Sequence, residues 1–204
     1  HQYMWAGIGD TYAKYYEAMI SSRDERLEHF TALGVAVSRM CCDPLLDYGP
    51  KAYEDHKKGL CTYDVEQVVL AIVVTTGIAS IFLTKDFTPD YNSGLAHAVF
   101  YALTSYPVIE ERHLHGEVVG FGVLLALLVD RQEDEFEKIY RLNRAIGLPT
   151  SLEDIEISEE QWEECMERIP DMSDVAHYPY KVTRKMLEEA MKRLKERAGR
   201  DDEE

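Results

Sequence analysis

Basic residues are scarce in this chain of 204 residues. It has 22 lysine and arginine residues against 38 aspartate and glutamate residues, which gives a formal net charge of −16. Proteins that bind nucleic acids or anionic membranes need a basic face to neutralise phosphate groups. We therefore expect neither a nucleic acid nor a membrane as a partner.

The sequence also lacks an apolar run long enough to cross a bilayer, and it opens without a charged-then-apolar leader. The longest apolar core, Val68–Leu83, has 16 residues, whereas a membrane-spanning helix needs about 20. The segment that contains it, residues 65–83, is expected to form a central helix that is buried on all sides.

Cysteine is rare, and the four cysteines have no recognisable spacing. Cys41 and Cys42 are adjacent, while Cys61 and Cys165 are isolated. This pattern fits neither a zinc site nor a disulfide framework. Reduced thiols are the simplest explanation, so we expect a cytoplasmic protein.

Strand patterns are missing as well. Apolar residues recur every three or four positions along most of the chain, which is typical of amphipathic helices. We expect an all-α helical bundle of about eight or nine helices that forms a single domain over residues 1–204. Pro44 is expected to kink or end the second helix. The predicted helices cover residues 10–21, 24–47, 51–58, 65–83, 94–105, 115–128, 134–146, 158–169 and 183–198.

Two histidines lie beside apolar helices. His97 is one turn inside the helix predicted over residues 94–105, and His115 opens the next one. Asp10 follows two glycines at the expected start of the first helix, where capping the helix N-terminus is the alternative to a functional role. Two imidazoles and a carboxylate could bind a metal ion. The spacing alone matches no compact metal motif, and a buried His97 bonded to a carbonyl, with His115 at the surface, explains it as well.

Four blocks of the sequence add a resemblance to these observations. They are AGIGDTYAKYYEA at residues 6–18, GLAHAVFYAL at 94–103, HGEVVGFGVLLALL at 115–128 and AIGLPTSLEDIEI at 145–157. In this order they resemble the C-terminal helical domain of the glycerol dehydrogenase branch of the iron-containing alcohol dehydrogenase family. The resemblance implies that Asp10, His97 and His115 bind one divalent metal, with zinc as the first candidate and iron or nickel as alternatives.

The resemblance further implies that this chain is the metal-binding part of an NAD-dependent dehydrogenase. The metal would act as a Lewis acid on the hydroxyl of glycerol or another small polyol or alcohol, and the alkoxide would deliver hydride to NAD. The family places its NAD site in an N-terminal α/β domain. Because no strand–GxGxxG–helix unit occurs in the sequence, we expect that domain to be missing and the chain to be inactive alone. Family members are commonly homo-oligomers, so self-association is also expected.

Several neighbouring residues are left with open roles. Glu117 could orient an imidazole or complement the helix dipole, and His113 could face the same side as the motif histidine two positions later. His177 is taken as structural. Phe100 occupies a position where many dehydrogenases of the family have a second histidine, so a proton relay there is in doubt. Residues 84–92 are expected to form a loop along one wall of the substrate pocket.

Two other interpretations remain. Dehydroquinate synthase-like and glycerol-1-phosphate dehydrogenase-like enzymes share the helical plan and an HGE-like segment. Their phosphorylated substrates need basic residues, and only Arg112 and Lys85 are candidates near the proposed site, which disfavours these enzymes. The remaining interpretation is a non-catalytic helical interaction module.

Overall fold

The computed structural model describes residues 1–84 and 91–201. Within these residues there are helices, turns and no strand, which confirms the all-α prediction. The described residues form eleven α-helical segments, or nine helices when the short α7 is set apart and α4 and α5 are taken together. Lys85 and most of the loop predicted over residues 84–92 lie outside the described residues.

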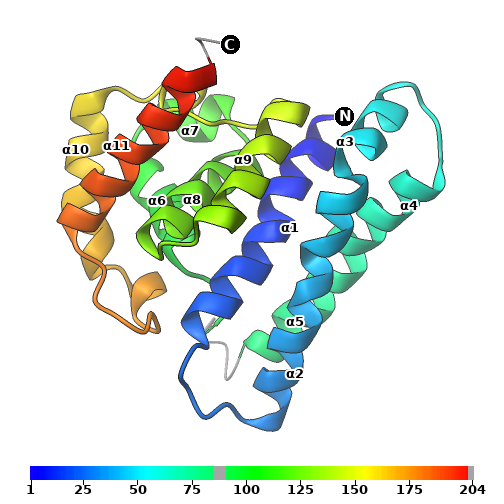
Figure 1. Cartoon of the computed structure of the whole chain (residues 1–204), viewed down its shortest axis with the longest axis horizontal. Helices are drawn as coiled ribbons and strands as arrows, with labels where there is room; N and C mark the ends of the chain where they lie inside the picture. The colour runs from blue at the N-terminus through cyan, green and yellow to red at the C-terminus, as the bar shows by residue number, and fades with distance from the viewer. Residues whose placement is uncertain (85–90, 202–204) are drawn as a thin grey trace.

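Helix α1 (Gln2–Ser21) runs between two groups of helices, as Figure 1 shows. One group consists of α2 (His29–Ser38), α3 (Asp43–Lys57), α4 (Tyr63–Leu70) and α5 (Thr76–Leu83). The other consists of α6 (Leu95–Leu103), α7 (Pro107–Arg112), α8 (His115–Val129), α9 (Glu133–Ile146), α10 (Glu159–Arg168) and α11 (Arg184–Asp201).

The centre of the core is α8. Every residue of this helix after His115 is buried, and its apolar side chains are spread around the whole helix instead of along one face. A helix that is apolar on all sides belongs in the interior of a protein. Helix α8 packs against both α1 and α6. It is therefore the central buried helix that the sequence analysis placed at residues 65–83.

Helix α1 begins at Gln2, so the predicted start at residue 10 is wrong, and Asp10 lies well inside the helix and does not cap its N-terminus. The two glycines before Asp10 do not form a turn. Gly9 lies against α8, where a Cβ atom would be 2.1 Å from the carbonyl oxygen of Gly116. A Cβ atom on Gly116 would in turn be 2.0 Å from the carbonyl oxygen of Ala6. The glycines therefore allow the two helix backbones to touch.

The prediction of one helix over residues 24–47 is also wrong. Helix α2 begins only at His29, and a 3₁₀ turn separates it from α3. Pro44 lies in the first turn of α3, where a missing N–H costs nothing, so it starts a helix instead of ending one. Helix α3 continues through Pro50, and the helix predicted over residues 51–58 is its second half.

Predictions for the second half of the chain agree better with the structure. Helix α9 ends at Gly147, which has a left-handed φ of 79°, as a glycine after a helix commonly does. Ser158 and Gln161 form the expected capping box at the start of α10. The segment predicted as a loop before His115 contains the short helix α7, which starts at Pro107.

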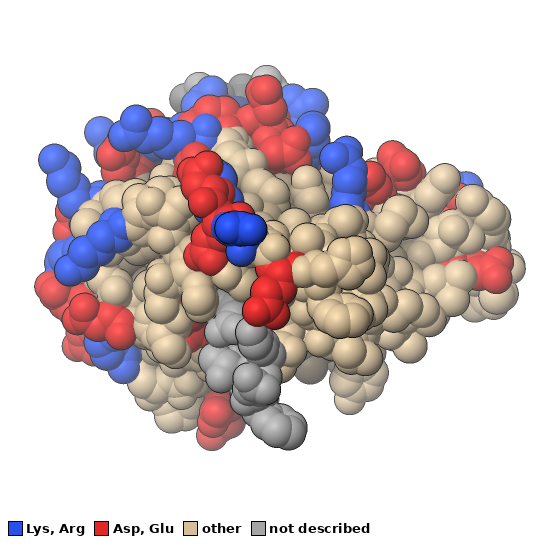
Figure 2. Space-filling model, turned by 90° about the horizontal axis from the view of Figure 1, so that it is seen from below, with Lys and Arg blue, Asp and Glu red and all other residues tan. Residues whose placement is uncertain are grey.

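Residues 65–83 form a surface helix, and the prediction that they are buried on all sides is wrong. Helices α4 and α5 are joined by a π-helical segment, Ala71–Thr75, and pack against α3 and α2. Their outer side chains are open, with Val73 67% and Ile81 73% exposed. This region lies in the right-hand part of Figure 2, where few charged residues are seen. By length and composition alone, the 21-residue helix Tyr63–Leu83 could cross a membrane, so the expectation that the chain lacks an apolar segment of that length is not confirmed.

We expect Gly9→Ala to lower the free energy of unfolding by about 2 kcal/mol or more, because the added methyl group overlaps the α8 backbone. Gly77→Ala is the matched control: Gly77 is helical in α5, and a Cβ atom there meets nothing within 4 Å. Because alanine has a higher helix propensity than glycine, Gly77→Ala should raise the free energy of unfolding by up to about 1 kcal/mol. Urea denaturation followed by circular dichroism measures both changes, and equal effects would contradict the backbone contact.

Candidate metal centre

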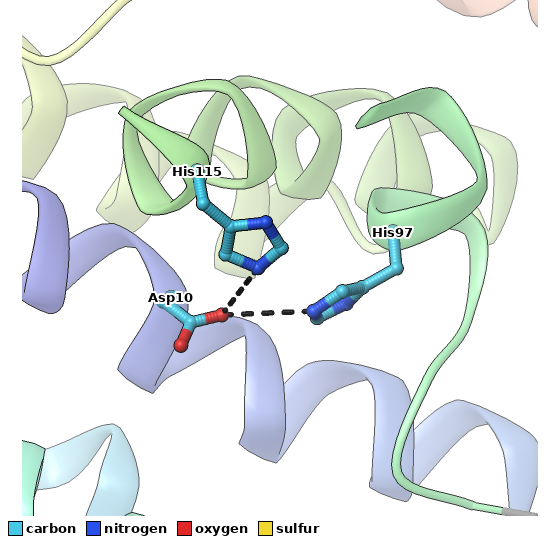
Figure 3. A group of neighbouring side chains, drawn as sticks. All are labelled: Asp10, His97 and His115. Atoms are coloured by element: carbon cyan, nitrogen blue, oxygen red, sulfur yellow. Dashed lines mark ion pairs between the residues drawn. The ribbon is translucent and has the colours of Figure 1, made fainter. Parts of the chain in front are cut away.

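The structure brings together the three residues that the sequence proposed as metal ligands. Asp10 comes from α1, His97 from α6, and His115 is the first residue of α8. Figure 3 shows the three side chains converging between these helices. Their potential ligand atoms all lie within 4.8 Å of one another. His97 lies 18 positions and Asp10 lies 105 positions before His115 in the sequence, yet the three side chains meet.

The distances within this cluster suit a shared ion better than direct hydrogen bonds. Asp10 Oδ1 is 3.6 Å from His97 Nε2 and 3.4 Å from His115 Nε2. Charge-assisted hydrogen bonds are shorter, at about 2.7–2.9 Å. Donor atoms around a tetrahedral zinc ion lie about 3.3–3.5 Å apart, because each bond is near 2.0–2.1 Å. The two separations from Asp10 Oδ1 are close to that spacing.

The cluster is open on one side. The side chain of His97 is only 9% exposed, whereas Asp10 is 35% and His115 43% exposed. Phe100, from α6, makes a T-shaped contact with the His115 imidazole, at 4.4 Å between ring centres. Phe100, which stands where many dehydrogenases of the family have a second histidine, therefore supports His115 by an apolar contact.

His97 has a partner that the sequence analysis missed. The Glu17 carboxylate is 2.6 Å from His97 Nδ1 and accepts a hydrogen bond of 3.0 Å from the His97 backbone N–H. Glu17 is completely buried. It lies seven residues after Asp10, two turns along the same face of α1. That spacing was the available signal, but nothing in the sequence shows which histidine Glu17 reaches.

These contacts shift the pKa values of two residues of the cluster, Asp10 and His97. Burial alone would raise the pKa of the Asp10 carboxyl, but the His115 and His97 imidazoles outweigh it and hold that pKa well below its ordinary value. Burial alone would lower the pKa of His97. The Glu17 and Asp10 carboxylates outweigh it and raise the pKa of His97 to about 9. Without a metal, the cluster is therefore an ion-paired network near neutral pH.

One buried cation lies close to this network. Lys14 is only 6% exposed and sits on α1 between Asp10 and Glu17. Its ammonium group donates a hydrogen bond of 2.7 Å to the carbonyl oxygen of Asn92. Arg112, one of the two basic residues considered for phosphate binding, instead forms an ion pair of 2.9 Å with Glu156.

Glu117, His113 and His177 make their contacts outside the cluster. Glu117 is 2.8 Å from His113 Nδ1 and accepts a hydrogen bond of 3.0 Å from the Leu114 backbone N–H. It therefore orients His113 and caps α8, and it does not orient a residue of the cluster. His177 contacts Glu25 and the ring of Tyr91, so it also belongs to a different part of the surface.

Known proteins that are similar to this chain include glycerol dehydrogenases and another dehydrogenase. No protein-family model matches the chain. A glycerol dehydrogenase from Thermotoga maritima is 31% identical, over 94% of this chain and 52% of the relative. The structure of a probable glycerol dehydrogenase from Sinorhizobium meliloti superposes with a TM-score of 0.78 at 28% identity, over 95% of this chain and 54% of that one. In sequence and in structure, the chain matches the C-terminal domain of these glycerol dehydrogenases.

The chain spans about half the length of the curated relatives it matches. Another relative of this glycerol dehydrogenase-like domain is hydroxycarboxylate dehydrogenase A from Escherichia coli, which is 33% identical over 76% of this chain and 42% of the relative. Both relatives are oxidoreductases by name. The family therefore includes proteins named for different hydroxyl-bearing substrates.

In the metal-free domain, the raised pKa of His97 makes stability depend on pH. A histidine whose pKa is about 9 when folded, against about 6.5 when unfolded, stabilises the protein fully below about pH 6.5 and loses this contribution as the pH rises through about 9. His97→Gln should therefore cost more stability at pH 6 than at pH 9.5. Urea unfolding of both proteins with a chelator present measures this. An equal or larger cost at pH 9.5 would contradict the proposed ion pairs.

Proposed function

We propose that this chain is the metal-binding part of an NAD-dependent oxidoreductase that acts on glycerol or a similarly small polyol or alcohol. The convergence of Asp10, His97 and His115 is the observation that carries the proposal. The names of the relatives support the reaction class. The described residues contain no strand, so the nucleotide would bind to another part of the enzyme, and we propose that the chain is inactive alone.

The side chains of the cluster fit a divalent metal. One carboxylate and two imidazoles suit zinc, iron or nickel, and we propose zinc first. Three protein ligands leave coordination positions free, as catalytic sites need and structural zinc sites do not. His115 and Asp10 are partly exposed, and in this proposal the free positions would face that open side. Residues 1–204 would then form a single metal-binding domain.

Each residue of the cluster has a distinct task in this proposal. A bound divalent metal supplies Lewis-acid polarisation of an alcohol oxygen. The low pKa of Asp10 keeps its carboxylate charged between the two imidazoles. His97 is held from behind by Glu17 and presents Nε2 to the cluster. Phe100 limits the positions of the His115 ring, while the open side admits a small hydroxyl compound.

A small hydroxy acid is the second candidate substrate. The relative named hydroxycarboxylate dehydrogenase supports it, and the buried ammonium group of Lys14 places a positive charge on the ligand helix. We also propose a cytoplasmic homo-oligomer. The free thiols of all four cysteines and the exposed apolar side chains of α4 and α5 support these two points.

Metal content tests the site directly. We expect close to one zinc ion per chain after loading and dialysis, and a loss of that ion in His97→Ala and His115→Ala, because each removes one ligand atom from the cluster. His113→Ala is the control, since His113 contacts Glu117 outside the cluster. Elemental analysis measures the metal, and circular dichroism checks that each variant stays helical. A wild-type chain without bound zinc would refute the assignment.

Activity tests the rest of the proposal. With NAD and either glycerol or a small hydroxy acid, the chain alone should give no absorbance of reduced nicotinamide at 340 nm, because no nucleotide site is expected on it. The same assay on a protein extended to the length of its relatives should show turnover. Turnover by these 204 residues alone would contradict the first expectation. An extended protein without turnover would favour the non-catalytic module.

A further inference from the structure

Glu17 makes an unusual double contact with one residue. Its carboxylate accepts the backbone N–H of His97 with one oxygen and lies against His97 Nδ1 with the other, at 3.0 and 2.6 Å. The Glu17 side chain is 1% exposed and that of His97 is 9% exposed. A buried carboxylate needs hydrogen-bond donors, and His97 supplies two of them from its backbone and its ring.

The backbone contact fixes where α6 starts. The first N–H groups of a helix have no acceptor within the helix, and the residue before α6 is Gly94, which has no side chain to cap it. Two other parts of the chain supply the acceptors. The Tyr178 hydroxyl accepts the N–H of Leu95, and Glu17 accepts that of His97. A Cβ atom on Gly94 would lie 3.0 Å from Glu17 Cγ, so the glycine leaves room for the carboxylate.

The ring contact fixes which nitrogen of His97 faces the cluster. The Glu17 carboxylate accepts hydrogen bonds and cannot donate them, so Nδ1, the nitrogen that it contacts, must carry the proton. When the ring is neutral, Nε2 therefore keeps its lone pair. Nε2 is the nitrogen that faces Asp10. Metal-ligating histidines commonly donate their second N–H to a carboxylate in this way, and loss of that partner costs about 10- to 100-fold in metal affinity.

We propose that Glu17 is a positioning residue that holds His97 in the tautomer and orientation needed to bind the metal. This inference rests on the proposed function of the cluster. Because Asp10 and Glu17 lie two turns apart on α1, a single helix supplies one ligand and the residue that orients another.

The chain contains a natural control for this role. Glu117 contacts His113 Nδ1 at 2.8 Å and accepts a backbone N–H, that of Leu114, at 3.0 Å. The arrangement matches that of Glu17, and both carboxylates are buried. His113, however, is not part of the group of potential ligands found among the described residues. Glu117→Gln therefore changes the same kind of carboxylate contact at a histidine that lies outside the cluster.

The test compares Glu17→Gln with Glu117→Gln in the full chain. We expect zinc affinity, measured by competition with a chromophoric chelator, to fall by about 10- to 100-fold in Glu17→Gln and by less than about threefold in Glu117→Gln. Both variants should lose some stability to urea. Nitrogen-15 NMR of the metal-free proteins adds a readout that a merely structural role would not move, namely which ring nitrogen of His97 carries the proton.

Unchanged zinc affinity in a folded Glu17→Gln would overturn the inference, as would an equal loss in Glu117→Gln, which would point to general destabilisation. A wild-type chain that binds no zinc contradicts the proposed function instead. The NMR experiment then decides the role of Glu17 in the metal-free protein above pH 10. A neutral His97 with its proton on Nδ1 in wild type, and on Nε2 in Glu17→Gln, supports positioning, and an unchanged tautomer refutes it.

Discussion

The direct contact between the backbones of α1 and α8 determines the geometry of the site. Gly9 and Gly116 meet where no Cβ atom would fit, so the two helices can neither separate nor slide without opening a gap in the core. Asp10 follows Gly9 and His115 precedes Gly116. The two polar residues are therefore placed by the same contact that excludes side chains, and their separation of 3.4 Å is a consequence of helix packing.

Helix α6 completes the arrangement by the same means. Gly122 of α8 lies against Ala96, where a Cβ atom would be 2.6 Å from the Ala96 carbonyl oxygen. His97 is the next residue, and Glu17 fixes both its backbone and its ring. Three helices thus meet at backbone distance, and each contributes one polar side chain next to the point of contact. The charged network is enclosed by an apolar core on three helices and is open to solvent on one side.

The sequence predicted the helical class, the later helix ends and the three residues of the cluster, but not the packing that brings them together. Gly7 and Gly9 have the local preferences of a turn, and the glycine at position 9 is explained only by the non-local approach of Gly116. The burial of residues 65–83 was predicted from composition, which does not show how many neighbours a segment has. Glu17 was missed because its partner lies 80 residues away.

The helices α2 to α5 contribute no side chain to the cluster of Asp10, His97 and His115. They pack around the far side of α1 and carry much of the exposed apolar surface. Substitutions in this group can therefore accumulate over evolution without changing the chemistry of the site, provided that the contact with α1 is kept. The same cluster could in this way be retained while the outer surface adapts to different neighbouring subunits or domains.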